Sequence, residues 1–146
     1  MKRIPGIKSK LLAHGVVAIL VGAAWLASVA SANSDAIVQT AGAVSYVSGG
    51  VGTDSIARLN ALAGDFNLKL VFALKSGEYV SGVRVAIADA AGKALLNVTS
   101  EGPWFLTKLP VGNYQVVATF AGNAVRRQID LGAAKMRTID FRWASE

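Results

Sequence analysis

The stretch FNLKLVFAL, residues 66–74, decides the fold. Large apolar side chains occupy every second position, which places Phe66, Leu68, Leu70, Phe72 and Leu74 on one face of an extended chain. The residues between them face the other way. Alternation with period two over this length predicts a β-strand with one face in a hydrophobic core.

Short segments with the same alternation lie on both sides of this strand. Turn residues such as Gly77, Gly92, Pro110 and Gly122 separate them, at intervals of about ten residues. The expected strands cover residues 37–50, 66–74, 79–88, 94–99, 104–106, 114–120, 125–131 and 136–143. This spacing predicts an all-β protein, a seven-stranded-type antiparallel β-sandwich.

One segment follows a different period and predicts a short helix. Thr53 or Asp54 is the expected N-cap, and Gly64 stands where a left-handed C-cap belongs. The apolar residues between them are spaced three apart, at Ile56, Leu59 and Leu62. We therefore expect about three helical turns at an end or edge of the sheet.

The first 32 residues are typical of a bacterial-type secretory signal. Four basic residues precede an almost wholly apolar run over residues 11–29, and Ala30 and Ala32 are the small residues that a signal peptidase recognises, with Asn33 as the mature start. The run has no twin arginine before it, so it predicts Sec-type export to the periplasm. The alternative is an uncleaved segment that anchors the protein in the inner membrane, because about 20 apolar residues can span a bilayer.

Removal of the signal leaves one expected domain, residues 33–146, with no stable membrane anchor. The whole chain has a net charge of +6, but residues 33–146 carry 11 basic and 9 acidic residues, a net charge of +2. This near-neutral balance argues against nucleic acid as a partner. The chain has no cysteine, so the domain must be held by its core without a disulfide.

The residue types of the mature chain exclude most catalytic chemistry. Its only histidine, His14, lies in the signal, so residues 33–146 lack both His and Cys. The usual zinc and copper ligands and the Ser-His-Asp and Cys-His nucleophile systems are therefore missing. We expect no enzyme, no metal site and no cofactor; a metal-free enzyme that uses paired carboxylates is the third-ranked alternative.

Three side chains are the candidate ligand contacts. Trp104 follows Pro103 in a turn and points outward if Phe105 points inward. Tyr79 could join it in an aromatic platform. Arg126 belongs to an Arg-Arg pair whose second member, Arg127, falls on the apolar face of its strand, which indicates an edge strand or a bulge.

The segments GVRVAI (residues 82–87), DAAG (89–92) and LPVGNYQV (109–116) resemble the carboxypeptidase regulatory-like domain of the transthyretin-like sandwich family. The resemblance covers about half of the mature chain, within an expected core of residues 66–143. It departs from the family at residues 99–105, where TSEGPWF replaces the usual turn. The resemblance implies a non-catalytic sandwich that serves as an accessory or binding module.

Two functional hypotheses follow. The first is a periplasmic binding or accessory module that acts on an envelope protein through its sheet edges or loops. The second is a glycan- or peptidoglycan-binding module that uses exposed aromatic residues. The sequence leaves the identity of the partner and the oligomeric state open.

Overall fold

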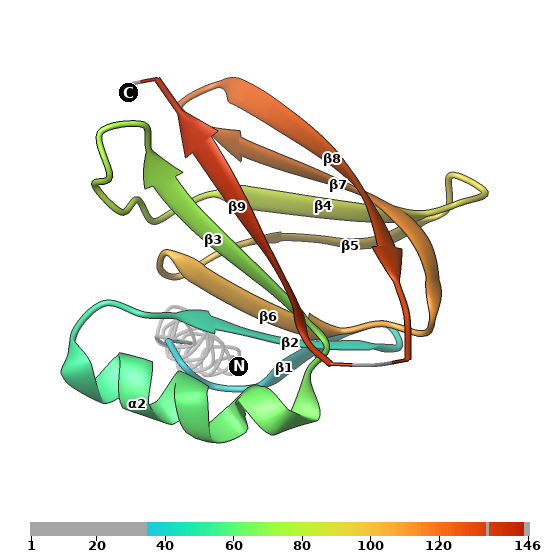
Figure 1. Cartoon of the computed structure of the whole chain (residues 1–146), viewed down its shortest axis with the longest axis horizontal. Coiled ribbons are helices and arrows are strands. Elements are labelled where there is room, and N and C mark those ends of the chain that lie inside the picture. Colours follow the sequence, from blue (N-terminus) through green and yellow to red (C-terminus); the bar gives the residue numbers. More distant parts are fainter. Residues whose placement is uncertain (1–34, 134, 145–146) are drawn as a thin grey trace, which may run out of the picture. The chain divides into compact units, whose positions relative to one another are not determined.

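The computed structural model describes residues 35–133 and 135–144, which form two β-sheets and one short helix (Figure 1). The predicted signal and its cleavage site at Ala30, Ala32 and Asn33 lie outside the described residues. The strands are β1 (Gln39–Ala41), β2 (Val44–Gly49), β3 (Leu68–Leu74), β4 (Arg84–Asp89), β5 (Ala94–Thr99), β6 (Trp104–Lys108), β7 (Gly112–Phe120), β8 (Asn123–Leu131) and β9 (Arg137–Trp143). The helical elements are α2 (Thr53–Leu62) and the 3₁₀ turn η2 (Ala63–Asp65).

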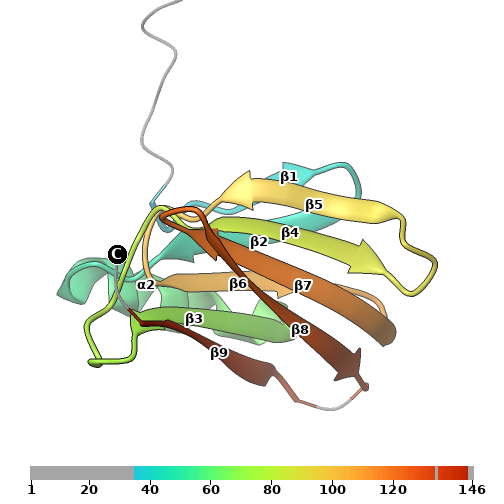
Figure 2. The same cartoon turned by 90° about the horizontal axis from the view of Figure 1, so that it is seen from above.

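The strands divide into a five-stranded sheet, sheet A, with the order β1-β2-β6-β3-β9, and a four-stranded sheet, sheet B, with the order β5-β4-β7-β8. Figure 2 shows the two sheets stacked. The all-β sandwich is confirmed. The seven-stranded antiparallel detail is wrong, because the described chain has nine strands and β3 pairs with β9 in parallel.

The parallel pair and the extra strands each have a local cause. After β8, the chain leaves the edge of sheet B and enters the neighbouring edge of sheet A, where β9 runs in the direction of β3. The expected strand over residues 37–50 is interrupted at Gly42, whose φ of 62° is left-handed. That turn folds the segment into the β1–β2 hairpin.

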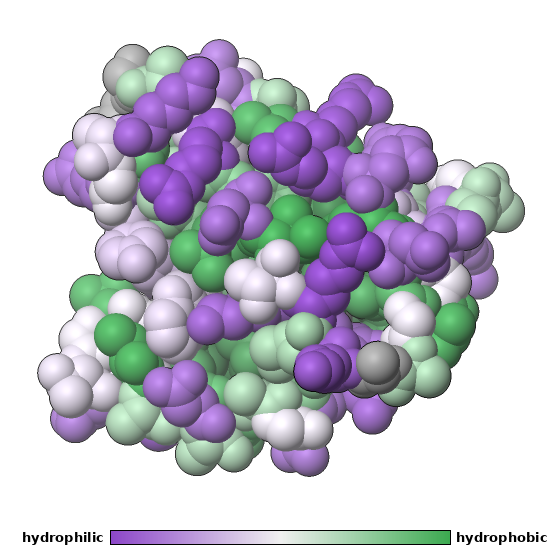
Figure 3. All heavy atoms as spheres, viewed as in Figure 1, coloured by the Kyte–Doolittle hydropathy of each residue, from purple (hydrophilic) through white to green (hydrophobic). Residues whose placement is uncertain are grey.

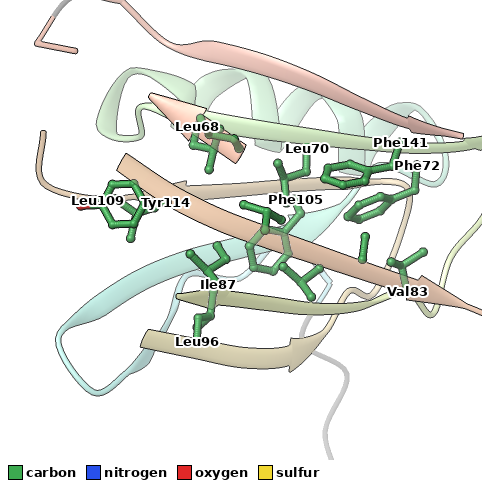
Figure 4. Packing of buried hydrophobic residues seen from close by; sticks show 14 of the residues in the cluster. Leu68, Leu70, Phe72, Val83, Ile87, Leu96, Phe105, Leu109, Tyr114 and Phe141 are labelled. Atoms are coloured by element: carbon green, nitrogen blue, oxygen red, sulfur yellow. The ribbon is translucent and has the colours of Figure 1, made fainter. Parts of the chain in front are cut away.

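The core lies between the sheets, as the alternation in residues 66–74 predicts. Leu68, Leu70, Phe72 and Leu74 all lie in the main hydrophobic cluster, together with inward residues from sheet B. Figure 4 shows Phe72 beside Phe141 in this layer, and their ring centroids are 5.8 Å apart. Phe66 is the exception to the prediction, because it precedes β3 and is buried in a second cluster.

The second cluster lies under α2, on the face of sheet A that points away from sheet B. It joins Leu59 of the helix to Val47 of β2 and Leu106 of β6. The helix is where the sequence predicts it, but its caps are not. Gly52 is the N-cap, with no side-chain hydrogen bond, and the chain continues through η2 past Gly64, which is not left-handed.

Candidate binding surfaces

Trp104 lies at the start of β6 and points away from the sandwich core. Its neighbour Phe105 is fully buried between the sheets, so the alternation of the strand places Trp104 on the outer face of sheet A. The prediction that Trp104 points outward is confirmed. The indole is nevertheless partly buried, because it packs against the cluster under α2.

Lys69 covers one face of the Trp104 ring. Its Nζ lies 3.5 Å from the ring centroid, a cation–π contact. Burial lowers the pKa of Lys69 below the ordinary lysine value, and the nearby carboxylate of Asp140 partly offsets this effect. The ring is therefore held in place and screened by a partly desolvated cation.

Tyr79 lies on the same face of sheet A as Trp104. The N–H of Leu74 donates to the carbonyl of Glu78, which sets Tyr79 directly opposite Ala73 of β3. Trp104 is directly opposite Val71 of the same strand. Directly opposed residues point to the same face of a sheet, so the two aromatic side chains share one face. Val71 and Ala73 are two residues apart, so the positions of Trp104 and Tyr79 are about 7 Å apart along β3. Tyr79 is the more accessible of the two, with 63% of its surface exposed.

Arg126 does not join this group. It lies on β8 opposite Val117, on the outer face of sheet B. Arg127 is opposite the fully buried Val116 and so points to the inner side, where its guanidinium lies 5.8 Å from the centroid of the Phe141 ring. The prediction of an edge strand at this arginine pair is confirmed, and the β7–β8 ladder runs through it without a bulge.

The four edge strands of the sandwich differ in charge. Strands β8 and β9 border one another on one side. They carry four arginines and two aspartates: Arg126, Arg127, Arg137, Arg142, Asp130 and Asp140. In the view of Figure 1, β8 and β9 face the viewer, and Figure 3 shows many hydrophilic side chains on this face. The other two edges, β1 and β5, carry no charged residue.

Strand β5 offers free main-chain groups along its outer edge. The N–H of Ser100 donates to the carbonyl of Val83, so Thr99 and Arg84 form a non-hydrogen-bonded pair. The N–H and C=O of Thr99, and by alternation those of Asn97, therefore point away from β4. A register shift between Ile87 and Ala88 ends this regular ladder toward the start of β5.

Two contributors to the outer face of sheet A, Lys69 and Asp140, were not among the sequence candidates. Both are outward positions of predicted strands, and such positions are usually solvated polar residues. Their proximity depends on the parallel pairing of β3 with β9, in which Asp140 is opposite Val71. The alternation predicts the face on which each residue lies but not which strands become neighbours.

The described residues contain no cluster of three or more His, Cys, Asp or Glu side chains suited to a metal ion. Within the same residues, no helix is long and apolar enough to span a membrane. No protein-family model matches the sequence, and no curated protein matches it.

Proposed function

We propose that residues 33–146 form a non-catalytic binding module that is exported to the periplasm and acts on an envelope protein. An extended segment of that protein would add to sheet B along β5. The carrying observation is the difference between the edges: β8 and β9 are lined by four arginines, whereas β5 is uncharged. The resemblance of residues 82–131 to the carboxypeptidase regulatory-like domain supports an accessory role.

Charged side chains on an edge strand prevent pairing with another chain, and proteins place them where pairing would be harmful. An edge without them, and with free main-chain groups at Asn97 and Thr99, is suited to accept a strand. Leu95 and Val98 are only partly buried against the core. An added strand would cover them and gain apolar contact as well as hydrogen bonds.

The test is site-specific photo-crosslinking of the full chain in intact envelopes. A crosslinker at Thr99 should capture one reproducible protein partner, and a crosslinker at Gln128 on β8 should not. Mass spectrometry of the bait also reads its N-terminus, which should be Asn33.

The matched variants are Asn97→Pro and Asn97→Thr. Proline removes an N–H that faces the free edge and makes no bond to β4, so it should abolish capture while the domain stays folded. Threonine keeps the N–H and should retain capture. Equal capture by both variants, or capture from position 128 alone, would exclude strand addition at β5.

Glycan binding at the outer face of sheet A is the second candidate, favoured by the placement of Tyr79 and Trp104 on one face. A sugar ring that stacks on Trp104 must use the ring face opposite Lys69 or displace the ammonium. Retention on a purified cell-wall fraction should then be lost in Trp104→Ala and Tyr79→Ala. The control is Val111→Ala, which removes an apolar side chain that is 65% exposed in the turn before β7.

A further inference from the structure

A polar hollow lies at one end of sheet B, at the base of the β4–β5 hairpin. Figures 1 and 2 show this hairpin projecting beyond the rest of the sheet. The hollow has a volume of about 500 Å³, which is within the size range of small-ligand sites. Its lining comes from three strands and the hairpin: Ala88, Asp89, Ala90, Gly92, Asn113, Tyr114, Gln115 and Gln128.

The register of the strands explains the shape of the hollow. Ala88 of β4, Gln115 of β7 and Gln128 of β8 form one row across the outer face of sheet B. The hairpin contributes Ala90 and Gly92. Small side chains thus line the side toward β4 and the hairpin, and longer amide side chains line the side toward β7 and β8.

The three amide side chains of the lining have no hydrogen-bond partner among the described residues: Asn113, Gln115 and Gln128. Asn67 shows the contrasting case, since its amide both donates to and accepts from the backbone of Leu109. An amide offers two donors and one acceptor oxygen in a plane. Three such groups around one concavity match a ligand whose own groups donate and accept at neighbouring positions.

The remaining lining narrows the class of ligand. No cation lines the hollow, and its one carboxylate, Asp89, already accepts through Oδ1 from the N–H groups of Ala91 and Lys93. A phosphate or carboxylate ligand would therefore find no counter-charge. The only large apolar side chain is Tyr114, which is almost fully buried, so the hollow has no apolar recess for a peptide side chain.

We propose that this hollow binds a neutral saccharide through the side-chain amides of Asn113, Gln115 and Gln128. Vicinal hydroxyl groups donate and accept side by side, as the amides do, and a hollow of this volume holds one or two sugar units. The site lies on the opposite sheet from Trp104 and Tyr79. Saccharide binding at this hollow also does not depend on strand addition at β5. The two proposals can fail separately, because strand addition is tested by crosslinking at Thr99.

The test is an NMR titration of the ¹⁵N-labelled full chain with two neutral probes, a glucose tetrasaccharide and an N-acetylglucosamine trisaccharide. At least one probe should shift the side-chain NH₂ signals of Asn113, Gln115 and Gln128 in a saturable way. The Gln115→Leu/Gln128→Leu variant should weaken that binding at least tenfold. Gln39→Leu, an amide change on β1, is the matched control and should leave binding unchanged.

A second variant guards against an indirect effect of losing two amides. Ala88→Leu fills the floor of the hollow, keeps all three amides and should also block the probe. No saturable shift with either probe, shifts confined to the Trp104 face, or unchanged binding by both variants would overturn the proposal. Saturable shifts of the same amides by an uncharged extended peptide, without any by the saccharides, would overturn the assignment of the ligand.

Discussion

The ammonium group of Lys69 lies 3.5 Å from the centre of the Trp104 indole ring. The two residues come from neighbouring strands of sheet A, and β9 brings the carboxylate of Asp140 to the same face. The ring draws the cation toward its electron-rich face, while burial removes part of the cation's water. The balance lowers the pKa of Lys69, with desolvation as the larger influence.

This lowered pKa predicts how stability depends on pH. The unfolded chain titrates at the ordinary lysine value of 10.5, and the folded chain releases the proton of Lys69 earlier. Between the two pKa values the unfolded state binds more protons, so the free energy of unfolding rises with pH. Urea unfolding of the protein and of Lys69→Met should therefore show the parent gaining stability relative to the variant as pH approaches 10.5. A parent that loses stability relative to Lys69→Met would contradict this sign.

Asp140→Asn tests the effect of the Asp140 carboxylate, which opposes the effect of burial on the pKa of Lys69. Asp140 raises the pKa of Lys69, so its loss should lower that pKa further and widen the pH range over which stability rises. NMR titration of the Lys69 side chain measures its pKa directly in the parent protein and in Asp140→Asn. Tyr114, whose pKa is raised mainly by burial and secondarily by Asp89, is common to all three proteins, and its contribution cancels in the comparison.

Asn67 should be a strong determinant of stability. Its side chain donates to the carbonyl of Leu109 at 2.7 Å and accepts from the N–H of Leu109 at 3.0 Å, and this joins the start of β3 to the turn before β7. Asn67→Ala would leave both backbone groups of a buried residue unpaired, at a cost of about 3 kcal/mol. Urea unfolding gives this value. Asn97→Ala, an exposed amide without a bond, should change stability by less than about 0.5 kcal/mol.

Apart from Phe66, alternation predicted the inward faces correctly, because the choice between core and solvent is local to each strand. Phe141 and Trp143 are buried as the pattern of residues 136–143 predicts. Partner strands were not predictable, because pairing joins segments far apart in the chain. The parallel pairing of β3 with β9 depends on the chain passing from sheet B to sheet A after β8, and the alternation of apolar residues carries no information on this path.

Strand pairing also decides which of the candidate ligand contacts lie together, and the sequence pattern did not predict it. Trp104 and Tyr79 lie on one face because both flank β3, whereas Arg126 lies on the other sheet. The amides of Gln115 and Gln128 are directly opposite one another, but each alone resembles an ordinary solvated residue. A site made by cross-strand neighbours becomes visible only when the register is known.

The arginine pair on β8 should prevent self-association. Arg126 faces outward and Arg127 lies at the open edge over Phe141, so both place charge where another strand would pair. Arg126→Thr/Arg127→Val should remove both cations from this edge, leave Asp130 as the one charged residue of β8, and produce dimers or larger species. Light scattering after size exclusion measures this. Arg84→Thr, on the central strand β4, should leave the mass unchanged, and equal association by both variants would assign the effect to net charge alone.

The chain crosses from sheet B to sheet A at Gly102, where contact with Gly49 leaves no space for a side chain. A Cβ at Gly102 would overlap the carbonyl oxygen of Gly49, a backbone atom of β2 that cannot rotate away. Gly102 has no left-handed φ, so alanine is excluded by space alone. Gly102→Ala should destabilise the fold by about 3 kcal/mol, because overpacking must push the two segments apart.

Gly64→Ala separates this steric effect from the loss of glycine itself. A Cβ at Gly64 meets nothing within 4 Å, and its φ is not left-handed, so alanine should be neutral or should stabilise by about 0.5 kcal/mol through a less flexible unfolded chain. Urea unfolding of the two variants should differ in sign or by at least about 2 kcal/mol. If Gly102→Ala and Gly64→Ala changed the free energy of unfolding equally, the backbone of β2 at Gly49 would have to move aside for the new Cβ. The connection between the two sheets at Gly102 would then not be rigid.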